Sequence, residues 1–156
     1  MSTITTQQFV ASAQDAWGSG VVQIGQAYTN SEDYKQIATD HVNNLYAYGL
    51  SPVLFKPTKA AHIQFRNSPD GAISYFVGGN PKFPEDQGFA LQPWTAVRFE
   101  NSGIVINGPQ AMAMGNYFFT DLNGQETKVE YSFGYLLDEN GELRINLHHS
   151  SLPYVG

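Results

Sequence analysis

The densest group of chemically active side chains lies near the end of the chain, where two histidines are followed by two serines. These residues, His148, His149, Ser150 and Ser151, lie in a segment with the alternating pattern of a β-strand. An imidazole, with an ordinary pKa of about 6.5, is the natural general base at neutral pH, and a neighbouring hydroxyl can orient a water or a small oxyanion. The strand therefore offers two His–Ser pairs as candidate chemical groups.

Because successive residues of a strand point to opposite faces, only one of these pairs can face a given cavity. Regular alternation places His149 and Ser151 on the same face as the apolar Ile145 and Leu147. If that face lines a cavity, His149 is the candidate base. If it forms a subunit interface instead, His148 and Ser150 lie inside. The residue types alone leave this choice open, and they also allow these groups simply to hydrogen-bond across the sheet.

A metal site at the histidine pair is not expected. Consecutive strand residues cannot both bind one ion without a bulge, and the only other imidazoles are His41, beside the buried face of a predicted helix, and His62. The chain has no cysteine, which excludes thiolate metal sites and thiol nucleophiles. It also lacks a nucleophile elbow, a phosphate loop and a dinucleotide-binding fingerprint. We therefore expect neither a metal nor a cofactor.

Length and charge indicate the class of protein. A chain of 156 residues predicts one domain over residues 1–156 with a substantial core. Its net charge of −6 and its lack of a Lys/Arg cluster argue against a nucleic-acid partner. No apolar stretch approaches the roughly 18 residues that span a bilayer, and the first residues lack the pattern of a signal peptide. These features predict a cytoplasmic protein with no membrane partner.

Two helices are predicted in the first third of the chain. The first starts with a capping box at Thr5 and Gln8, and its apolar residues recur at helical spacing as far as Tyr28. The second has Ser31 as its N-cap and Gly49 as its stop signal.

After Gly49 the hydrophobic pattern becomes alternating, which predicts β-structure. Val53–Phe55 opens the sheet, and a meander of about six strands follows: 61–66, 72–77, 94–99, 111–120, 127–137 and the last strand from Leu143. The Ser-Pro-Asp-Gly sequence at 68–71 predicts a hairpin between the first two, and Asn-Gly pairs mark the last two turns. The irregular stretch 78–93 predicts a lid, a binding loop or an interface element.

Helices followed by strands indicate a segregated α+β fold. One face of the strand 127–137 is entirely apolar or aromatic: Val129, Tyr131, Phe133, Tyr135 and Leu137. A curved sheet that wraps such a face around a helix leaves a conical cavity.

Three segments in this order resemble the iota-class carbonic anhydrases. They are Leu54–Thr58, Ser74–Val77, and His148–Ser151 followed by a Leu-Pro pair. The resemblance implies a cone-shaped α+β barrel of the nuclear-transport-factor-2-like fold, related to the association domain of calcium/calmodulin-dependent kinase II. Many members of that class have a third histidine before the pair, whereas Leu147 stands here. In this respect the chain resembles the metal-free members.

The resemblance also implies a function and a site. It implies a carbonate dehydratase that converts carbon dioxide to bicarbonate without a metal, and a homodimer. The implied pocket is lined by Thr58, Tyr75 and the terminal His-Ser segment, with Thr58, Tyr75 and Ser150 contacting the substrate. The implied catalytic set is Thr58, Tyr75, His148, His149, Ser150 and Ser151.

Two other functions remain open from the residues alone. The same cone hosts isomerases and dehydratases that use a cavity carboxylate, for which Asp40 and Glu130 are the available acids. It also hosts modules for oligomerisation or small-ligand binding that perform no chemistry.

Overall fold

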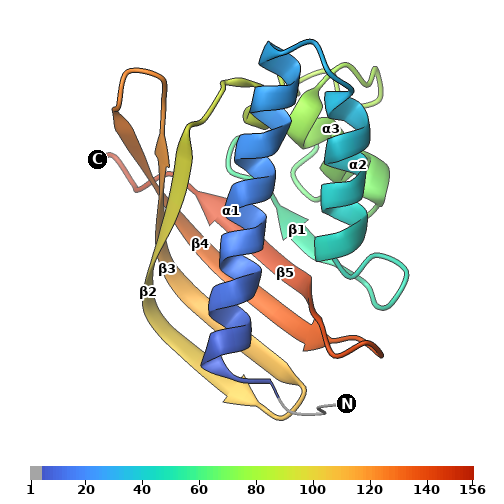
Figure 1. Cartoon of the computed structure of the whole chain (residues 1–156), viewed down its shortest axis with the longest axis vertical. Coiled ribbons are helices and arrows are strands. Elements are labelled where there is room, and N and C mark those ends of the chain that lie inside the picture. Colours follow the sequence, from blue (N-terminus) through green and yellow to red (C-terminus); the bar gives the residue numbers. More distant parts are fainter. Residues whose placement is uncertain (1–4) are drawn as a thin grey trace.

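Within residues 5–156, which the computed structural model describes, three α-helices pack on one side of a curved five-stranded sheet (Figure 1). The helices are α1 (Gln7–Thr29), α2 (Tyr34–Leu45) and α3 (Pro69–Val77), and η1 (Phe89–Leu91) is a 3-10 helix. The strands are β1 (Leu54–Lys56), β2 (Ala96–Asn107), β3 (Gln110–Thr120), β4 (Glu126–Leu137) and β5 (Leu143–Ser151). Their order in the sheet is β1-β5-β4-β3-β2, with β1 parallel to β5 and the other pairs antiparallel.

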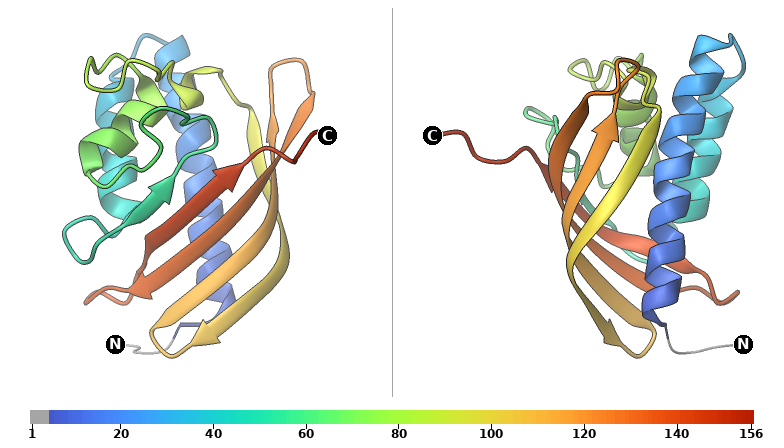
Figure 2. Two further views of the ribbon diagram at one scale, coloured as in Figure 1. Left: turned by 180° about the vertical axis from the view of Figure 1, so that it is seen from behind. Right: turned by 60° about the vertical axis from the view of Figure 1, so that its left-hand side comes forward.

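The two faces of the sheet differ in composition. Figure 2 shows the helices together on the concave side, while the C-terminal segment extends away from them. One row of paired residues crosses the concave face: Phe55, His148, Phe133, Ala113 and Ile104. The next row points outward: Leu54, Leu147, Gly134, Met112 and Val105. The aromatic inner face predicted for β4 is present, since its residues from Val129 to Tyr135 that point inward are all at most 2% exposed.

Helix α1 lies against both the sheet and α2. Its N-cap is Thr6, whose hydroxyl accepts a hydrogen bond from the Phe9 N–H at 3.2 Å, so the helix starts one residue later than the predicted cap at Thr5. A side chain at Gly20 would collide with the imidazole of His41, at 2.1 Å from its Nδ1. This glycine therefore allows α1 and α2 to pack closely.

The boundaries of α2 also differ from the prediction. Its N-cap is Asp33 rather than Ser31, and Ser31 instead has a positive φ of 58° in the preceding turn. The helix ends at Leu45, before Gly49. This early end places Tyr46 in extended backbone, from which its side chain enters the core.

The hairpin predicted over residues 61–77 is wrong. Ser68 is the N-cap of α3, its hydroxyl accepting from the Gly71 N–H at 3.4 Å, and Pro69 occupies the first turn. A capping serine followed by proline is a helix start as well as a turn signal. The short apolar run after it carries no periodicity that separates a buried helix from a strand. Residues 61–66 form an irregular segment, and the sheet has five strands rather than about six.

The strand predicted at 94–99 is longer than expected. β2 continues to Asn107 through a register shift between Asn101 and Gly103, where the sequence Asn-Ser-Gly resembles a turn. The predictions for β3, β4 and β5 are confirmed within a residue or two.

A second register shift lies in β5 and decides which face each residue takes. Gly134 pairs with Leu147 and the next residue, Tyr135, pairs with Ile145, so Asn146 is an extra residue in the strand. Ile145 and His148 therefore both point inward, although regular alternation would separate them. The assumption that His149 shares a face with Ile145 is wrong for this reason.

No helix among residues 5–156 is long and apolar enough to cross a membrane.

Candidate active site

A small closed cavity lies between the helices and the inner face of the sheet. It encloses about 10 Å³, close to the smallest volume that holds one water molecule. Its wall is mostly aromatic and carries a few convergent polar groups: Trp17, Phe55, Pro57, Thr58, Tyr75, Phe76, Phe89, Tyr117, His148 and Ser150. A mostly apolar cavity with a few polar groups aimed into it is the usual form of a small-molecule site.

The imidazole of His148 is held between two phenylalanine rings of the neighbouring strands. Phe133 stacks on it at 4.0 Å between ring centroids and Phe55 at 4.7 Å, both nearly parallel. The Tyr46 hydroxyl lies 2.8 Å from Nδ1 and the Tyr117 hydroxyl lies 3.1 Å from Nε2. The ring is thus fixed in orientation and both of its nitrogens have partners.

Three hydroxyls meet beside this imidazole. The Ser150 Oγ lies 2.5 Å from the Tyr117 hydroxyl and 2.6 Å from the Thr58 Oγ1. Tyr75, on α3, has its hydroxyl on the same cavity, where it accepts a hydrogen bond from the backbone N–H of Lys59 at 3.2 Å. The sheet thus supplies Ser150 and Tyr117, the segment after β1 supplies Thr58, and α3 supplies Tyr75.

Burial keeps these groups neutral near pH 7. It raises the pKa of the Tyr75 and Tyr117 hydroxyls above their ordinary value, although hydrogen bonds oppose this in part. It also holds the pKa of His148 well below the ordinary value, and the nearby His149 and His41 add to this effect. The cavity therefore offers neutral hydroxyls and a neutral imidazole rather than charges.

A buried ion pair holds α3, which carries Tyr75, against the neighbouring segment 61–66. Arg66 binds the carboxylate of Asp86 through two hydrogen bonds of 2.7 Å, and the Ser74 hydroxyl donates to the same carboxylate at 2.6 Å. Arg66 also donates to the Gly71 carbonyl at 2.8 Å. A bidentate pair of this kind is rigid, so it joins the 61–66 segment, α3 and the 78–93 loop.

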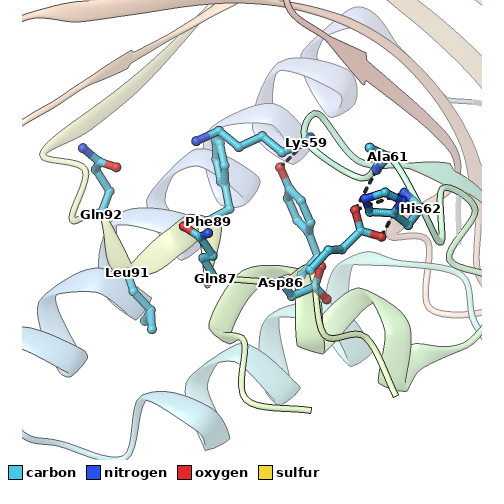
Figure 3. A pocket seen from close by; sticks show the side chains of 11 residues that line it. Lys59, Ala61, His62, Asp86, Gln87, Phe89, Leu91 and Gln92 are labelled. Atoms are coloured by element: carbon cyan, nitrogen blue, oxygen red, sulfur yellow. Dashed lines mark hydrogen bonds between the residues drawn. The ribbon is translucent and has the colours of Figure 1, made fainter. Parts of the chain in front are cut away.

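Outside the cavity lies a larger, open pocket of about 480 Å³, shown in Figure 3. Tyr75 and Phe89 line both spaces, and their rings stack at 5.5 Å, so they form the wall between them. The Lys59 side chain extends over Phe89, with its amino group 6.0 Å from the ring centroid. Glu85 accepts hydrogen bonds from the N–H groups of residues 61–63, which lower its pKa to about 2.

The structure brings four of the six predicted site residues together. Thr58, Tyr75, His148 and Ser150 all line the closed cavity. His149 and Ser151 lie on the outer face of the sheet, where Ser151 donates to Glu130 at 3.2 Å. The bulge at Asn146 thus selects the 148/150 pair for the interior.

Sequence reasoning missed three polar partners of this site. The apolar periodicity of the first helix includes Trp17 but does not reveal that its indole N–H donates to the Tyr46 hydroxyl at 3.0 Å. Tyr46 and Tyr117 have the aromatic rings typical of a core. The signal that could have found Tyr117 is its place in β3, where strand alternation puts it on the inner face with Ala113 and Phe119.

The chain was compared with known proteins. The sequence profile of the metal-independent carbonic anhydrases matches residues 8–152. The chain belongs to this family. It is 43% identical over 152 residues to a metal-independent carbonic anhydrase of Nostoc sp. (strain PCC 7120 / SAG 25.82 / UTEX 2576), which covers 96% of this chain and 74% of the relative.

Solved structures agree with this membership. The crystal structure of a cyanobacterial iota-carbonic anhydrase complexed with bicarbonate has a TM-score of 0.96 and 41% identity, covering 100% of this chain and 97% of the other. A calcium/calmodulin-dependent protein kinase II association domain from Xanthomonas campestris has a TM-score of 0.61 at 21% identity, covering 97% and 91%, and shows the fold alone. The chain is thus a carbonate dehydratase with the nuclear-transport-factor-2-like cone.

The geometry of the cavity also bears on the isomerase alternative and on metal binding. The acids proposed for an isomerase are absent from the cavity wall, since Asp40 accepts from Gln36 on the exposed side of α2 and Glu130 lies on the outer face. Among residues 5–156, no group of three or more His, Asp or Glu side chains could hold a metal ion. The polar groups of the cavity are hydroxyls and one imidazole.

Proposed function

We propose that the closed cavity is the place where this enzyme hydrates carbon dioxide, with Thr58, Tyr75 and Ser150 contacting the substrate. The observation that carries this proposal is the convergence of their hydroxyls on one small aromatic-walled space from three separate parts of the chain. The iota-carbonic anhydrase whose structure contains bicarbonate supports it, because the two chains superpose over their full length. In this proposal His148 contributes through Tyr117, which lies between it and Ser150.

The chemical difficulty of the reaction is the nucleophile. Bulk water, with a pKa of about 15.7, supplies almost no hydroxide at neutral pH, and zinc enzymes overcome this by acidifying a bound water. Here the water must lose its proton while it attacks the carbon. A hydroxyl can accept that proton as it donates its own to an oxygen of carbon dioxide, so no free hydroxide needs to form. The product of this step is carbonic acid, which loses a proton to solvent to give bicarbonate.

The hydroxyls also stabilise the charge that develops on the oxygens of carbon dioxide. Neutral donors held in a dry cavity are effective here because they need no reorganisation during the reaction. A tyrosine hydroxyl keeps its hydrogen at neutral pH, and burial raises the pKa of Tyr75 further, so this hydroxyl can act as a donor throughout the neutral range. The rings of Phe55, Phe76 and Phe89 provide the apolar surface against which carbon dioxide lies, once side-chain movement widens the cavity beyond its volume of about 10 Å³.

A stopped-flow assay of carbon dioxide hydration tests the proposal. Tyr75→Phe removes one donor and should lower kcat/KM on the order of a hundredfold, whereas Tyr135→Phe, which removes a buried hydroxyl outside the cavity, should not. Activity of the unmodified enzyme should survive a strong chelator. Near-normal turnover of Tyr75→Phe would remove this residue from the mechanism, and activity lost to the chelator and restored by added metal would contradict metal-free hydration.

We also propose that the enzyme is a homodimer that uses the outer face of the sheet. The outward row Leu54, Leu147, Gly134, Met112 and Val105 is apolar, and Leu54, Met112 and Val105 are each more than half exposed. A hollow of about 350 Å³ lies along this row. Because contiguous apolar patches of this kind usually mark an interface, a second copy is the partner we propose.

We further propose that residues 1–156 act as one domain in the cytoplasm. The absence of cysteine from this sequence fits a reducing compartment, and the acidic net charge of −6 fits a freely dissolved protein. Cell fractionation followed by the hydration assay tests this placement.

A further inference from the structure

A continuous chain of hydrogen bonds runs from helix α1 to the imidazole at the cavity. The indole Nε1–H of Trp17 donates to the Tyr46 hydroxyl at 3.0 Å, and this hydroxyl lies 2.8 Å from the Nδ1 of His148. On the other side of the ring, Nε2 lies 3.1 Å from the Tyr117 hydroxyl. All four side chains are at most 2% exposed, so these groups must satisfy one another.

Trp17 fixes the direction of the whole series of hydrogen bonds, because an indole N–H can only donate. The Tyr46 oxygen accepts from Trp17, which leaves the hydrogen of Tyr46 with one available acceptor, the Nδ1 of His148. If Nδ1 carried a hydrogen instead, Tyr46 would receive two donors and its own hydrogen would be buried without a partner. An imidazolium would create the same conflict. The arrangement that satisfies every group has the hydrogen of His148 on Nε2.

The tautomer of His148 in turn fixes the direction of the hydrogen bonds between the imidazole and the cavity. With its hydrogen on Nε2, His148 donates to the Tyr117 oxygen, and Tyr117 then donates to Ser150 at 2.5 Å. Ser150 in turn donates to the Thr58 Oγ1 at 2.6 Å. The hydrogen of Thr58 is the one that the chain leaves free for a molecule in the cavity.

The Tyr75 hydroxyl is also oriented as a hydrogen-bond donor, for an independent reason. Its oxygen accepts from the backbone N–H of Lys59, another group that can only donate, so its own hydrogen is available to the neighbouring Thr58 hydroxyl or to a molecule in the cavity. Two donor-only groups, one at each side of the site, thus direct the hydroxyls of Thr58 and Tyr75 into the cavity as donors.

We propose that Trp17 and Tyr46 are positioning residues that fix the tautomer of His148 and, through it, the direction of the whole hydroxyl chain. The cavity then presents hydrogen-bond donors to its contents. This polarity suits bicarbonate and the oxygens of carbon dioxide as they gain negative charge. The inference deepens the proposed function and rests on its assignment of the cavity.

The direct test is the tautomer of His148, measured by nuclear magnetic resonance on the ¹⁵N-labelled protein. Two-bond correlations between the ring carbon-bound protons and both nitrogens show which nitrogen carries the hydrogen, and His148→Gln identifies the signals by their loss. The expected result in the unmodified enzyme near pH 7 is hydrogen on Nε2 alone. Hydrogen on Nδ1, or on both nitrogens, would overturn the proposal whatever the activity of the enzyme.

Tyr46→Phe separates positioning from simple packing. It keeps the ring and removes the donor to Nδ1, so His148 becomes free to accept from Tyr117 and the chain can reverse. The expected result is a second tautomer together with a fall in kcat/KM on the order of tenfold, with a larger KM for bicarbonate. Trp17→Phe should act in the same direction with a smaller change, since Tyr46 remains.

Tyr131→Phe is the matched control. It removes another buried hydroxyl of the inner face, one that donates to Asn101 and not to the chain, and it should change neither the tautomer nor KM. A Tyr46→Phe enzyme that loses activity while His148 keeps its hydrogen on Nε2 alone would reduce Tyr46 to a packing role. If instead the tautomer responds as expected but Tyr75→Phe and Ser150→Ala retain full activity, the polarity stands and the assignment of the cavity fails.

Discussion

His148 and His149 are neighbours in the chain, yet they lie in opposite environments on the two faces of one sheet. His148 is 2% exposed, lies between Phe133 and Phe55, and has a hydroxyl at each ring nitrogen. His149 is exposed on the outer face beside Ser132 and Met114. The same side chain is therefore part of a buried polar chain in one position and a surface group in the next.

Burial and hydrogen-bond partners, rather than residue type, therefore determine the role of each imidazole. The inner histidine is kept neutral by burial and has no nitrogen free for substrate, so its contribution passes through Tyr117. The two serines that follow repeat the contrast. Ser150 joins the hydroxyls of Tyr117 and Thr58, whereas Ser151 donates to a glutamate on the outer face.

The largest expected effect is a contrast between these serines. Ser150→Ala removes the hydroxyl between Tyr117 and Thr58 and should lower kcat/KM on the order of a hundredfold. Ser151→Ala makes the same change on the outer face and should stay within about twofold. Stopped-flow carbon dioxide hydration measures both. Equal losses in the two variants would contradict the division between the faces.

The next effect concerns the buried imidazoles. Burial lowers the pKa of His41 to about 4 and that of His148 well below its ordinary value. The unfolded chain takes up protons on these residues near pH 6.5 while the folded protein does not, so protonation favours unfolding. The free energy of unfolding should therefore fall as the pH falls from about 6.5 towards 4, by about 1.4 kcal/mol per pH unit for each imidazole.

Urea unfolding at several pH values measures this slope. His62→Gln, which removes an exposed imidazole, is the control and should leave the slope unchanged. Stability that does not change between about pH 6.5 and 5 would show that the inner histidines are not held neutral.

The smallest expected effect is on the outer face. Met112 is 55% exposed in the middle of the outward row, and Met112→Glu would place a charge on each side of a two-fold interface. The dimer should dissociate at least about tenfold more readily, with hydration activity per chain largely kept. Analytical ultracentrifugation measures the association. An unmodified enzyme that sediments as a monomer would contradict the proposed interface.

The strands were easier to predict than the segment between α2 and β2. β3, β4 and β5 have long alternating runs joined by Asn-Gly turns, two local signals that agree. α3 is short and buried on most sides, so its sequence lacks the polar face that identifies a helix. The 61–66 segment resembles a strand, but its N–H groups bind the distant carboxylate of Glu85, a contact that no local pattern reveals.

The residues of the site also differ in whether the sequence reveals them. The His-Ser segment stands out by its residue types alone. Thr58 and Tyr75 are identified only through the resemblance to a family, since each is an ordinary residue in its own element. Trp17 and Tyr46 could not be found by pattern because their apolar rings are typical of a core, and their polar atoms meet only after α1, α2 and β5 have packed. The choice between the two His–Ser pairs depended on pairing with β4, which sequence alternation does not contain.

The extra residue at Asn146 has a consequence for how members of the family are aligned. A relative whose last strand lacked this residue would have regular alternation and would still place an inward imidazole beside its equivalent of Phe133. Its histidine would then be one position nearer to the counterpart of Ile145 than His148 is here. An alignment without a gap at this point would pair the buried histidine of that relative with Leu147, and would wrongly suggest that one of the two proteins had lost it.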